Sequence, residues 1–360
     1  MKREKTAMPP TQLIDIKDAI ANLGEAFAGA VAGAPGALVE TDYRIAGYPV
    51  RLRIAGAKLA ADIERSLGHL RVAGAPDPAL TIEVWDDEEV GPVGWTEWPD
   101  DVDFYGTLTV AEDARFVLNQ RQSSVMLLDR RENRITGCVR ARSALFLDER
   151  ARPFHRLLSI WLDDRDIQFI HAALSVVEGH GLLFVGKGGS GKSTSSVACF
   201  LAGFPFLSDD FVALEKAEEG HLVGHSLYAT CLIASDHIGR FASLARIARP
   251  ANHDFEPKSV VFLADHQAAR FAPDTPIAAV ILPKVVDRPQ TTFRRAKPME
   301  AMLALAPTSI IILPGAAPSA LDKLSELVTT APAFWLELGH DVGQIVPTVR
   351  RICGELAGNG

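Results

Sequence analysis

The feature that most constrains the fold of this chain is a glycine-rich segment near its middle. Residues 186–193 read Gly-Lys-Gly-Gly-Ser-Gly-Lys-Ser and fit the pattern G-x-x-x-x-G-K-[ST] at every position. The apolar stretch Leu182–Val185 precedes the segment, and a stretch typical of a helix follows from Lys192 to about Ala202. A strand, a glycine-rich loop and a helix in this order predict a phosphate-binding loop in an α/β fold.

The residue types in this loop suit a nucleotide. Glycines let backbone N–H groups approach a phosphate closely, and the N-terminus of the following helix adds a favourable dipole. We expect Lys192 to reach the β- and γ-phosphates and the Ser193 hydroxyl to ligate Mg²⁺. The chain is therefore predicted to use ATP and Mg²⁺. The predicted nucleotide-binding residues are Gly186, Gly188, Gly189, Ser190, Gly191, Lys192, Ser193 and Thr194.

Two adjacent carboxylates, Asp209 and Asp210, follow the next strand-like segment, Phe204–Leu207. Ligands of α/β sheets bind at the carboxyl ends of the strands, so both side chains are expected near the loop. One carboxylate can complete the Mg²⁺ shell while the other accepts a proton from a hydroxyl group. An exposed acidic turn has the same sequence signature, and that alternative stays open at this point.

The pattern of the whole chain predicts two domains preceded by a helix. Residues 1–36 are predicted to form this helix and a linker, and residues 37–165 an α+β domain with an antiparallel sheet. Residues 166–360 are predicted to form the P-loop domain, with a mostly parallel core. The N-terminal domain is expected either to bind the acceptor or to regulate the site.

Composition excludes several classes of protein. The 360 residues carry 37 Lys and Arg against 45 Asp and Glu, a net charge of −8, which argues against a nucleic-acid binder. No apolar run approaches the ~18 residues that span a bilayer, so no membrane contact and a cytoplasmic location are expected. The four cysteines lie far apart and are predicted to be reduced and mostly buried: Cys138, Cys199, Cys231 and Cys353.

The first half of the chain has an uneven charge distribution. Residues 85–103 contain eight acids and three tryptophans, Trp85, Trp95 and Trp98, whereas residues 115–165 contain eleven arginines. Tryptophan and arginine anchor many interfaces, so a docking surface is one interpretation. The favoured interpretation is a loop and a solvated sheet face, which could pair with each other within the domain, because charge runs usually face water.

These residues together resemble a known family. His171, the strand pair around it, the loop at 186–193 and the segment Phe206–Asp210 are similar to the catalytic domain of HPr kinase/phosphorylase and its relatives. The resemblance covers about residues 166–215. It implies a fold similar to that of the ATP-dependent phosphoenolpyruvate carboxykinases. It also implies transfer of the γ-phosphate of ATP to a serine hydroxyl in the presence of Mg²⁺.

The resemblance also implies roles for individual residues. Asp209 would be the general base, and Lys192 would hold the transferred phosphate. Asp210 and Ser193 would serve the Mg²⁺ ion, and His171 would orient Asp209. The sequence leaves open which further cation stabilises the transferred phosphate, and the candidates are Arg240, Lys258, Arg294 and Arg295.

The chain departs from the family in two segments. The Glu-x-Arg-Gly segment and the Gly-Arg-Asn loop tied to HPr recognition are not found after the acidic pair. The chain therefore resembles an HPr-kinase-related kinase, a group that includes kinases of lasso-peptide precursors, and a peptide or small-protein acceptor is expected. Because HPr kinases are hexamers, the resemblance is compatible with a homo-oligomer.

Two other functions fit the same residues. One is a small-molecule kinase, because the carboxykinases act on metabolites, and the other is a regulatory ATP-binding module that transfers no phosphate. Neither Asn-Lys-x-Asp nor Leu-Ser-Gly-Gly-Gln occurs in the chain, which argues against a GTPase and an ABC ATPase.

Overall fold

The computed structural model describes residues 16–93, 102, 106–251, 257–266, 269–310 and 319–358. The chain divides into two compact units. Unit 1 comprises residues 1–42, 49–61 and 74–145, and unit 2 comprises residues 43–48, 62–73 and 146–360. Residues 146–165, which we expected in the N-terminal domain, thus belong to the same unit as the glycine-rich loop.

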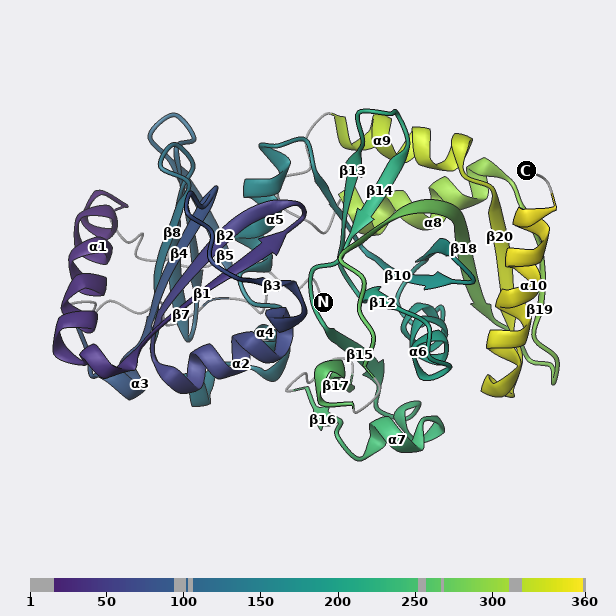
Figure 1. The fold of residues 1–360 in the computed structure, drawn as a ribbon, viewed down its shortest axis with the longest axis horizontal. Coiled ribbons are helices and arrows are strands. Elements are labelled where there is room, and N and C mark those ends of the chain that lie inside the picture. Colours follow the sequence, from purple (N-terminus) through teal and green to yellow (C-terminus); the bar gives the residue numbers. More distant parts are fainter. Residues whose placement is uncertain are drawn as a thin grey trace, which may run out of the picture. The chain divides into compact units, whose positions relative to one another are not determined.

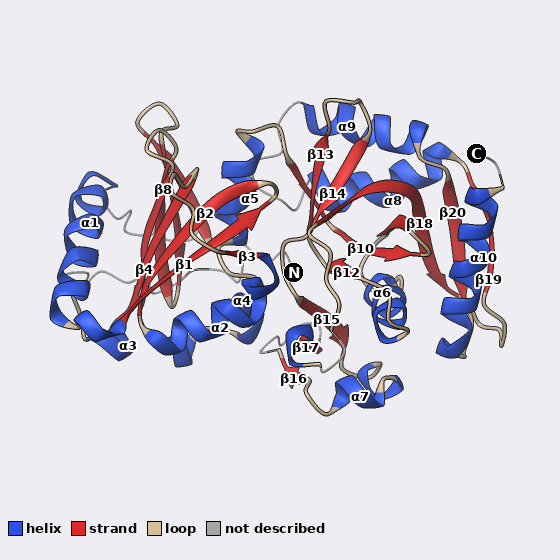
Figure 2. Ribbon diagram, in the orientation of Figure 1, coloured by secondary structure: helices blue, strands red, loops and turns tan. Residues whose placement is uncertain are grey.

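Unit 1 contains most of an eight-stranded sheet with the order β3-β1-β2-β4-β8-β7-β6-β5, of which β3 and the turn between β1 and β2 fall in unit 2 (Figures 1 and 2). Its strands are β1 (Leu38–Ile45), β2 (Tyr48–Ala55), β3 (Arg71–Val72), β4 (Leu80–Asp86), β5 (Thr107–Ala111), β6 (Phe116–Arg121), β7 (Ser124–Asp129) and β8 (Arg134–Val139). The helices associated with these strands are α1 (Ile16–Gly33), α2 (Ala57–Leu67) and α3 (Asp87–Val90).

The sheet of unit 1 is mixed, whereas the sequence predicted an antiparallel one. Strand β4 pairs parallel with both β2 and β8. Helix α2 lies between β2 and β4 in the sequence, and a helical crossover brings the second strand back in the direction of the first. Helix α1 covers part of one sheet face, where Leu23 and Phe27 pack in one cluster with Trp85 and Cys138.

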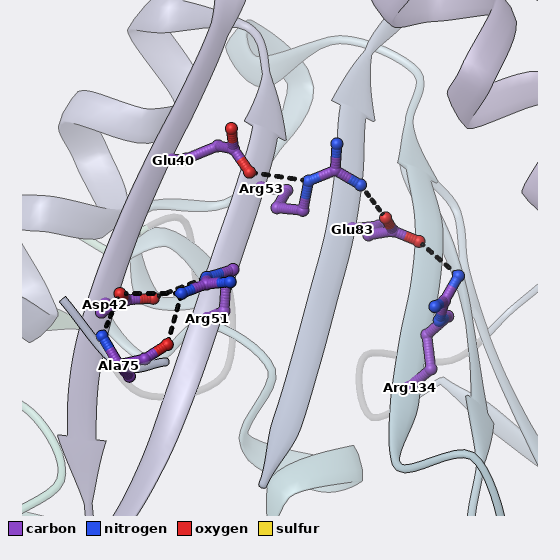
Figure 3. A network of polar contacts seen from close by, with 7 residues as sticks. All are labelled: Glu40, Asp42, Arg51, Arg53, Ala75, Glu83 and Arg134. Carbon is purple, nitrogen blue, oxygen red and sulfur yellow. Dashed lines mark hydrogen bonds and ion pairs between the residues drawn. The ribbon is translucent and has the colours of Figure 1, made fainter. Parts of the chain in front are cut away.

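The acids at 86–89 are bonded within unit 1 by backbone N–H groups and by the side chains of Trp85 and Ser143, and their pairing with the arginine-rich segment stays a prediction. Each acid at 86–89 accepts a hydrogen bond within the unit, for example Asp86 from the backbone N–H of Arg142 at 3.1 Å. Figure 3 shows a separate network of hydrogen bonds and ion pairs between acids and arginines on β1, β2, β4 and β8. Its residues are Glu40, Asp42, Arg51, Arg53, Ala75, Glu83 and Arg134. Trp95 and Trp98 lie outside the described residues.

Unit 2 contains a nine-stranded sheet and a three-stranded one. The larger sheet consists of β9 (Gln168–Ile170), β10 (Ala172–Val177), β11 (His180–Val185), β12 (Phe206–Ser208), β13 (Val212–Lys216), β14 (Leu222–His225), β18 (Asp274–Val285), β19 (Thr292–Ala296) and β20 (Ala333–Leu338). The smaller sheet consists of β15 (Thr230–Ala234), β16 (Arg249–Pro250) and β17 (Lys258–Phe262). The helices are α4 (Leu147–Ala151), α5 (His155–Asp163), α6 (Lys192–Leu201), α7 (Ala242–Ala245), α8 (Pro298–Ile310), α9 (Ser319–Thr330) and α10 (Ile345–Ala357).

The prediction of a mostly parallel core is wrong. Parallel pairing in the larger sheet joins β11 to β18 and β18 to β20, and β10 lies between β11 and β12 and runs antiparallel to both. The reason is a tight turn at Glu178 and Gly179, whose φ angles of 49° and 80° suit a two-residue hairpin. Because β11 and β12 each oppose β10, they run in the same direction, and their carboxyl ends lie at the same edge of the sheet.

Alternating residues of the central strands bury the two faces of this sheet in separate hydrophobic clusters. Phe184 and Ile281 pack with Val197 of α6 and Ile352 of α10. On the other face, residues such as Leu183 and Val280 pack with α8 and α9 (Figure 1). A sheet buried on both faces is rigid, so the loops at its carboxyl edge have a fixed support.

Two further expectations concern cysteines and membranes. All four cysteines are buried and free, as predicted. Among the helices of the described residues, none combines the length and apolar character needed to cross a bilayer.

Candidate functional site

Strand register brings the predicted site residues together. His171 immediately precedes β10, whose first residue, Ala172, pairs with Val185 at the end of β11. Further along β10, Leu174 pairs with Ser208 at the end of β12. The start of the antiparallel strand β10 therefore lies beside the ends of β11 and β12. His171, the loop that begins at residue 186 and the acids at 209–210 consequently share one edge of the sheet.

The glycine-rich loop has the backbone that its sequence requires. Gly186, Gly189 and Gly191 have φ angles of 145°, 73° and 106°, a region that other residues rarely adopt. Residues 187–189 are exposed, Ser190, Gly191, Ser193 and Thr194 are half-buried, and Lys192 is buried. The Lys192 Nζ donates to the carbonyl oxygens of Gly186 at 2.6 Å and Lys187 at 3.3 Å. The amine thus lies inside the loop, bonded to its backbone.

Gly191→Ala is expected to damage this loop. A Cβ at position 191 would lie 2.3 Å from Cδ1 of Leu338, and φ there is 106°. Backbone strain of this kind costs about 1–3 kcal/mol, so we expect a loss of that size in the free energy of unfolding, measured by urea denaturation. Gly354→Ala on α10 is the matched control, because its Cβ would meet nothing within 4 Å, and it should stabilise by about 0.5–1 kcal/mol. Equal effects of the two substitutions would contradict the strained-loop interpretation.

Burial and charge have opposite effects on Lys192. Burial lowers the pKa of its amine, while the nearby carboxylates of Asp210 and Asp209 raise it. The structure therefore assembles a buried cation against two acids at the mouth of the loop. A nucleotide phosphate would replace part of the charge that the acids now supply.

Asp209 is the more deeply buried acid. It is 2% exposed and accepts a hydrogen bond from the backbone N–H of Leu232 on β15 at 3.2 Å. Burial raises its pKa to about 6, and the charge of Asp210 acts in the same direction. The nearby Ser193 hydroxyl opposes this rise. Asp209 is therefore the acid that faces the serine of the loop.

Asp210 points in a different direction. Its backbone is left-handed, with φ of 71°, and its Oδ1 lies 2.8 Å from Nε2 of His171. Its Oδ2 accepts a hydrogen bond from Nη1 of Arg152. Burial would raise the pKa of Asp210, but the charges of Arg152 and His171 outweigh burial and hold the pKa well below its ordinary value. Asp210 therefore remains ionised.

The two pairs of residues differ from those predicted. The family resemblance implied that Ser193 acts with Asp210 and His171 with Asp209, whereas in the structure Ser193 lies near Asp209 and His171 contacts Asp210. The backbone of Asp210 is left-handed, a conformation that aspartate adopts more often than most residues, but an acidic pair in a sequence does not show which of its two members adopts it. Backbone geometry thus separates the environments of the two acids.

Sequence reasoning missed Arg152, the arginine bonded to Asp210. It follows α4, separated from Asp210 by 58 positions, and was one of eleven arginines between residues 115 and 165. Of the proposed cations, Lys258 begins β17, and its charge lowers the pKa of Asp210. Arg294 and Arg295 instead face the acids Glu337 and Glu355. For Arg240, the structure supplies no role.

The oxygen atoms of this site fit Mg²⁺. Among the described residues, no group of three or more His, Cys, Asp or Glu side chains could hold a metal alone. Mg²⁺ seldom needs such a group, because it binds through one or two carboxylates, waters and substrate phosphates. The Ser193 hydroxyl and the nearby Asp209 carboxylate, whose Oδ1 is buried without a hydrogen-bond partner among the described residues, form a suitable donor set.

Comparisons with known proteins add distant matches among solved structures only. No protein-family model matches the sequence, and no curated protein matches it. Among solved structures, the HPr(Ser) kinase/phosphatase of Coxiella burnetii is similar over 53% of this chain and 94% of its own chain. The match has 15% sequence identity and a TM-score of 0.33. The function inferred for the chain therefore rests on the residues of its own site.

Proposed function

We propose that the protein is an ATP- and Mg²⁺-dependent kinase that transfers the γ-phosphate to a hydroxyl group, with a serine of a peptide or small protein as the acceptor. The observation that carries the proposal is the convergence of three elements at one sheet edge. They are the loop with buried Lys192, the pair of Ser193 and Asp209, and the pair of His171 and Asp210. Phosphoryl transfer requires little more than such positioning and electrostatic stabilisation.

In the proposed reaction, the acceptor oxygen forms a bond to the γ-phosphorus. The bond between that phosphorus and the bridging oxygen breaks, and ADP leaves with the electron pair. The hydroxyl proton passes to the pair formed by His171 and Asp210. Lys192 and the backbone N–H groups of the loop hold the phosphates. Mg²⁺, held by Ser193 and Asp209, would neutralise charge on the β- and γ-phosphates when bound.

This assignment exchanges the roles that the resemblance implied for the two acids. A carboxylate that holds a metal must be near the loop serine, which is the position of Asp209. A group that receives the acceptor proton benefits from an oriented imidazole, which is the partner of Asp210.

The kinase proposal is tested with γ-labelled ATP, Mg²⁺ and a cell extract. Label in a protein or peptide supports the proposed acceptor, and label only in a metabolite would replace it with a small molecule. Absence of label in every fraction would overturn the kinase proposal in favour of a regulatory ATP-binding module.

Lys192→Ala should reduce labelling by about 10²-fold or more, because a buried phosphate contact is lost. Lys187→Ala is the matched control in the same loop, because position 187 is exposed and only its backbone carbonyl contacts Lys192. Lys187→Ala should label at close to the wild-type rate. Label that survives Lys192→Ala undiminished would point to a contaminating kinase.

A further inference from the structure

Arg152 lies outside every motif of the sequence, yet it contacts the acidic pair. Its side chain is 11% exposed, with Nη1 donating to Asp210 and Nη2 donating to Oδ2 of Asp148 at 3.1 Å. Both carboxylates raise the pKa of Arg152 against the effect of burial. The planar guanidinium therefore bridges two carboxylates with two of its nitrogens, a geometry that lysine cannot reproduce.

The carboxylate of Asp210 is held at both oxygens. Arg152 bonds Oδ2, and Nε2 of His171 lies 2.8 Å from Oδ1. Two partners at the two oxygens restrict the rotation of the carboxylate, which a single partner leaves free. The charges of Lys192 and Lys258 also act on Asp210, so these cations would attract its carboxylate in other orientations.

The backbone that carries Arg152 is anchored on both sides. The carbonyl oxygen of Ala151 accepts hydrogen bonds from Oγ of Ser66 at 2.5 Å and Oγ1 of Thr230 at 3.0 Å. The carbonyl oxygen of Pro153 accepts one from the hydroxyl of Tyr228 at 3.0 Å. Anchored supports of this kind hold functional groups within the tolerance that catalysis demands.

We propose that Arg152 is a positioning residue of the phosphoryl-transfer site. By holding Oδ2 of Asp210, it keeps Oδ1 directed at His171, so that the pair faces the acceptor hydroxyl in one orientation. The inference rests on the proposed kinase function, within which it assigns a role to the segment before β9. We expect Arg152 to affect the rate of transfer rather than ATP binding. The reason is that Arg152 contacts Asp210, whereas the loop residue Ser193 lies near Asp209.

Arg152→Ala should lower kcat by about 10²-fold and change the KM for ATP by less than about threefold. Arg152→Lys should recover part of the rate, because lysine restores the positive charge. The recovery should be incomplete, because an ammonium group lacks the planar geometry with which the guanidinium bridges two carboxylates. Guanidinium ion added to Arg152→Ala should also restore part of it. Arg150→Ala is the matched control, since Arg150 pairs with Asp62 at 3.4 Å, and it should keep a near-wild-type kcat.

The same variants separate positioning from a general structural effect. In an Asp210→Asn background, Arg152→Ala should change kcat by less than about threefold, because the residue it positions is already lost. Independent effects of the two substitutions would overturn the inference. So would a loss in Arg152→Ala that neither Arg152→Lys nor guanidinium reduces.

Failure of the kinase proposal is distinguishable from failure of this inference. If wild-type protein transfers no phosphate, the proposed function is wrong, and the pairing of Arg152 with Asp210 is measured by unfolding instead. A double-mutant cycle in urea with the same two substitutions should then show an interaction between the sites. Additive effects on stability would contradict the contact itself and overturn the positioning role.

Discussion

Asp210→Asn should lower kcat by about 10³-fold and leave the Mg²⁺ concentration for half-maximal activity unchanged. Asp209→Asn should instead raise that Mg²⁺ concentration by about tenfold or more, and part of the lost rate should return at high Mg²⁺. The reason is the division of contacts, because Asp209 faces the loop serine Ser193 whereas Asp210 faces His171. The measurement is a Mg²⁺ titration of the initial rate at saturating ATP.

Asp236→Asn is a suitable control for this titration, because the side chain of Asp236 is 80% exposed. It should match wild type in both kcat and Mg²⁺ dependence. The opposite pattern, a Mg²⁺ effect in Asp210→Asn and a pure kcat effect in Asp209→Asn, would restore the roles that the family resemblance implies. Either pattern identifies which acid faces the metal.

Asp209→Asn should also stabilise the metal-free protein at neutral pH. The pKa of Asp209 is raised from 3.8 to about 6 in the folded state, so folding favours the protonated acid. The free energy of unfolding of wild type therefore falls as the pH rises from about 4 through about 6, and the penalty is complete above that range. At 1.36 kcal/mol for each pKa unit, the penalty is about 3 kcal/mol, and the permanently neutral asparagine escapes most of it.

The test is urea denaturation between pH 4 and pH 8 in the presence of a chelator. The stabilisation by Asp209→Asn should be largest at pH 7 to 8 and should disappear near pH 4. Asp210→Asn is the internal comparison with the opposite sign, because the pKa of Asp210 is lowered and its ionised form stabilises the fold at neutral pH. A pH-independent effect of Asp209→Asn would show that burial does not perturb this acid.

Much of the candidate site was predictable because its signals are local. The octet at 186–193 requires glycines at positive φ, and the structure has them at Gly186, Gly189 and Gly191. The segments expected as strands around the loop are strands β11 and β12, and the helix expected from Lys192 is α6. Backbone requirements and apolar periodicity each depend on residues that are close together in the chain, so they can be recognised in one sequence.

The arrangement of strands was less predictable. A helix between two strands normally signals a parallel pair, but the hairpin of β10 and β11 inserts β10 between β11 and β12. Strand pairing depends on which hydrophobic faces are buried together, and this is a property of the assembled sheet. The predicted juxtaposition of loop and acids nevertheless survives, because β11 and β12 still run in the same direction.

The glycine-rich loop between a strand and a helix, the acidic pair after β12 and His171 beside β10 could all be located from the sequence, since each depends on neighbouring residues. Tertiary structure alone decided which acid meets Ser193 and which meets His171, because a left-handed φ at Asp210 sets the direction of its side chain. It alone also brought Arg152 to Asp210 across 58 positions. Contacts between distant segments form only when the sheet and its flanking helices pack, and no local pattern records them.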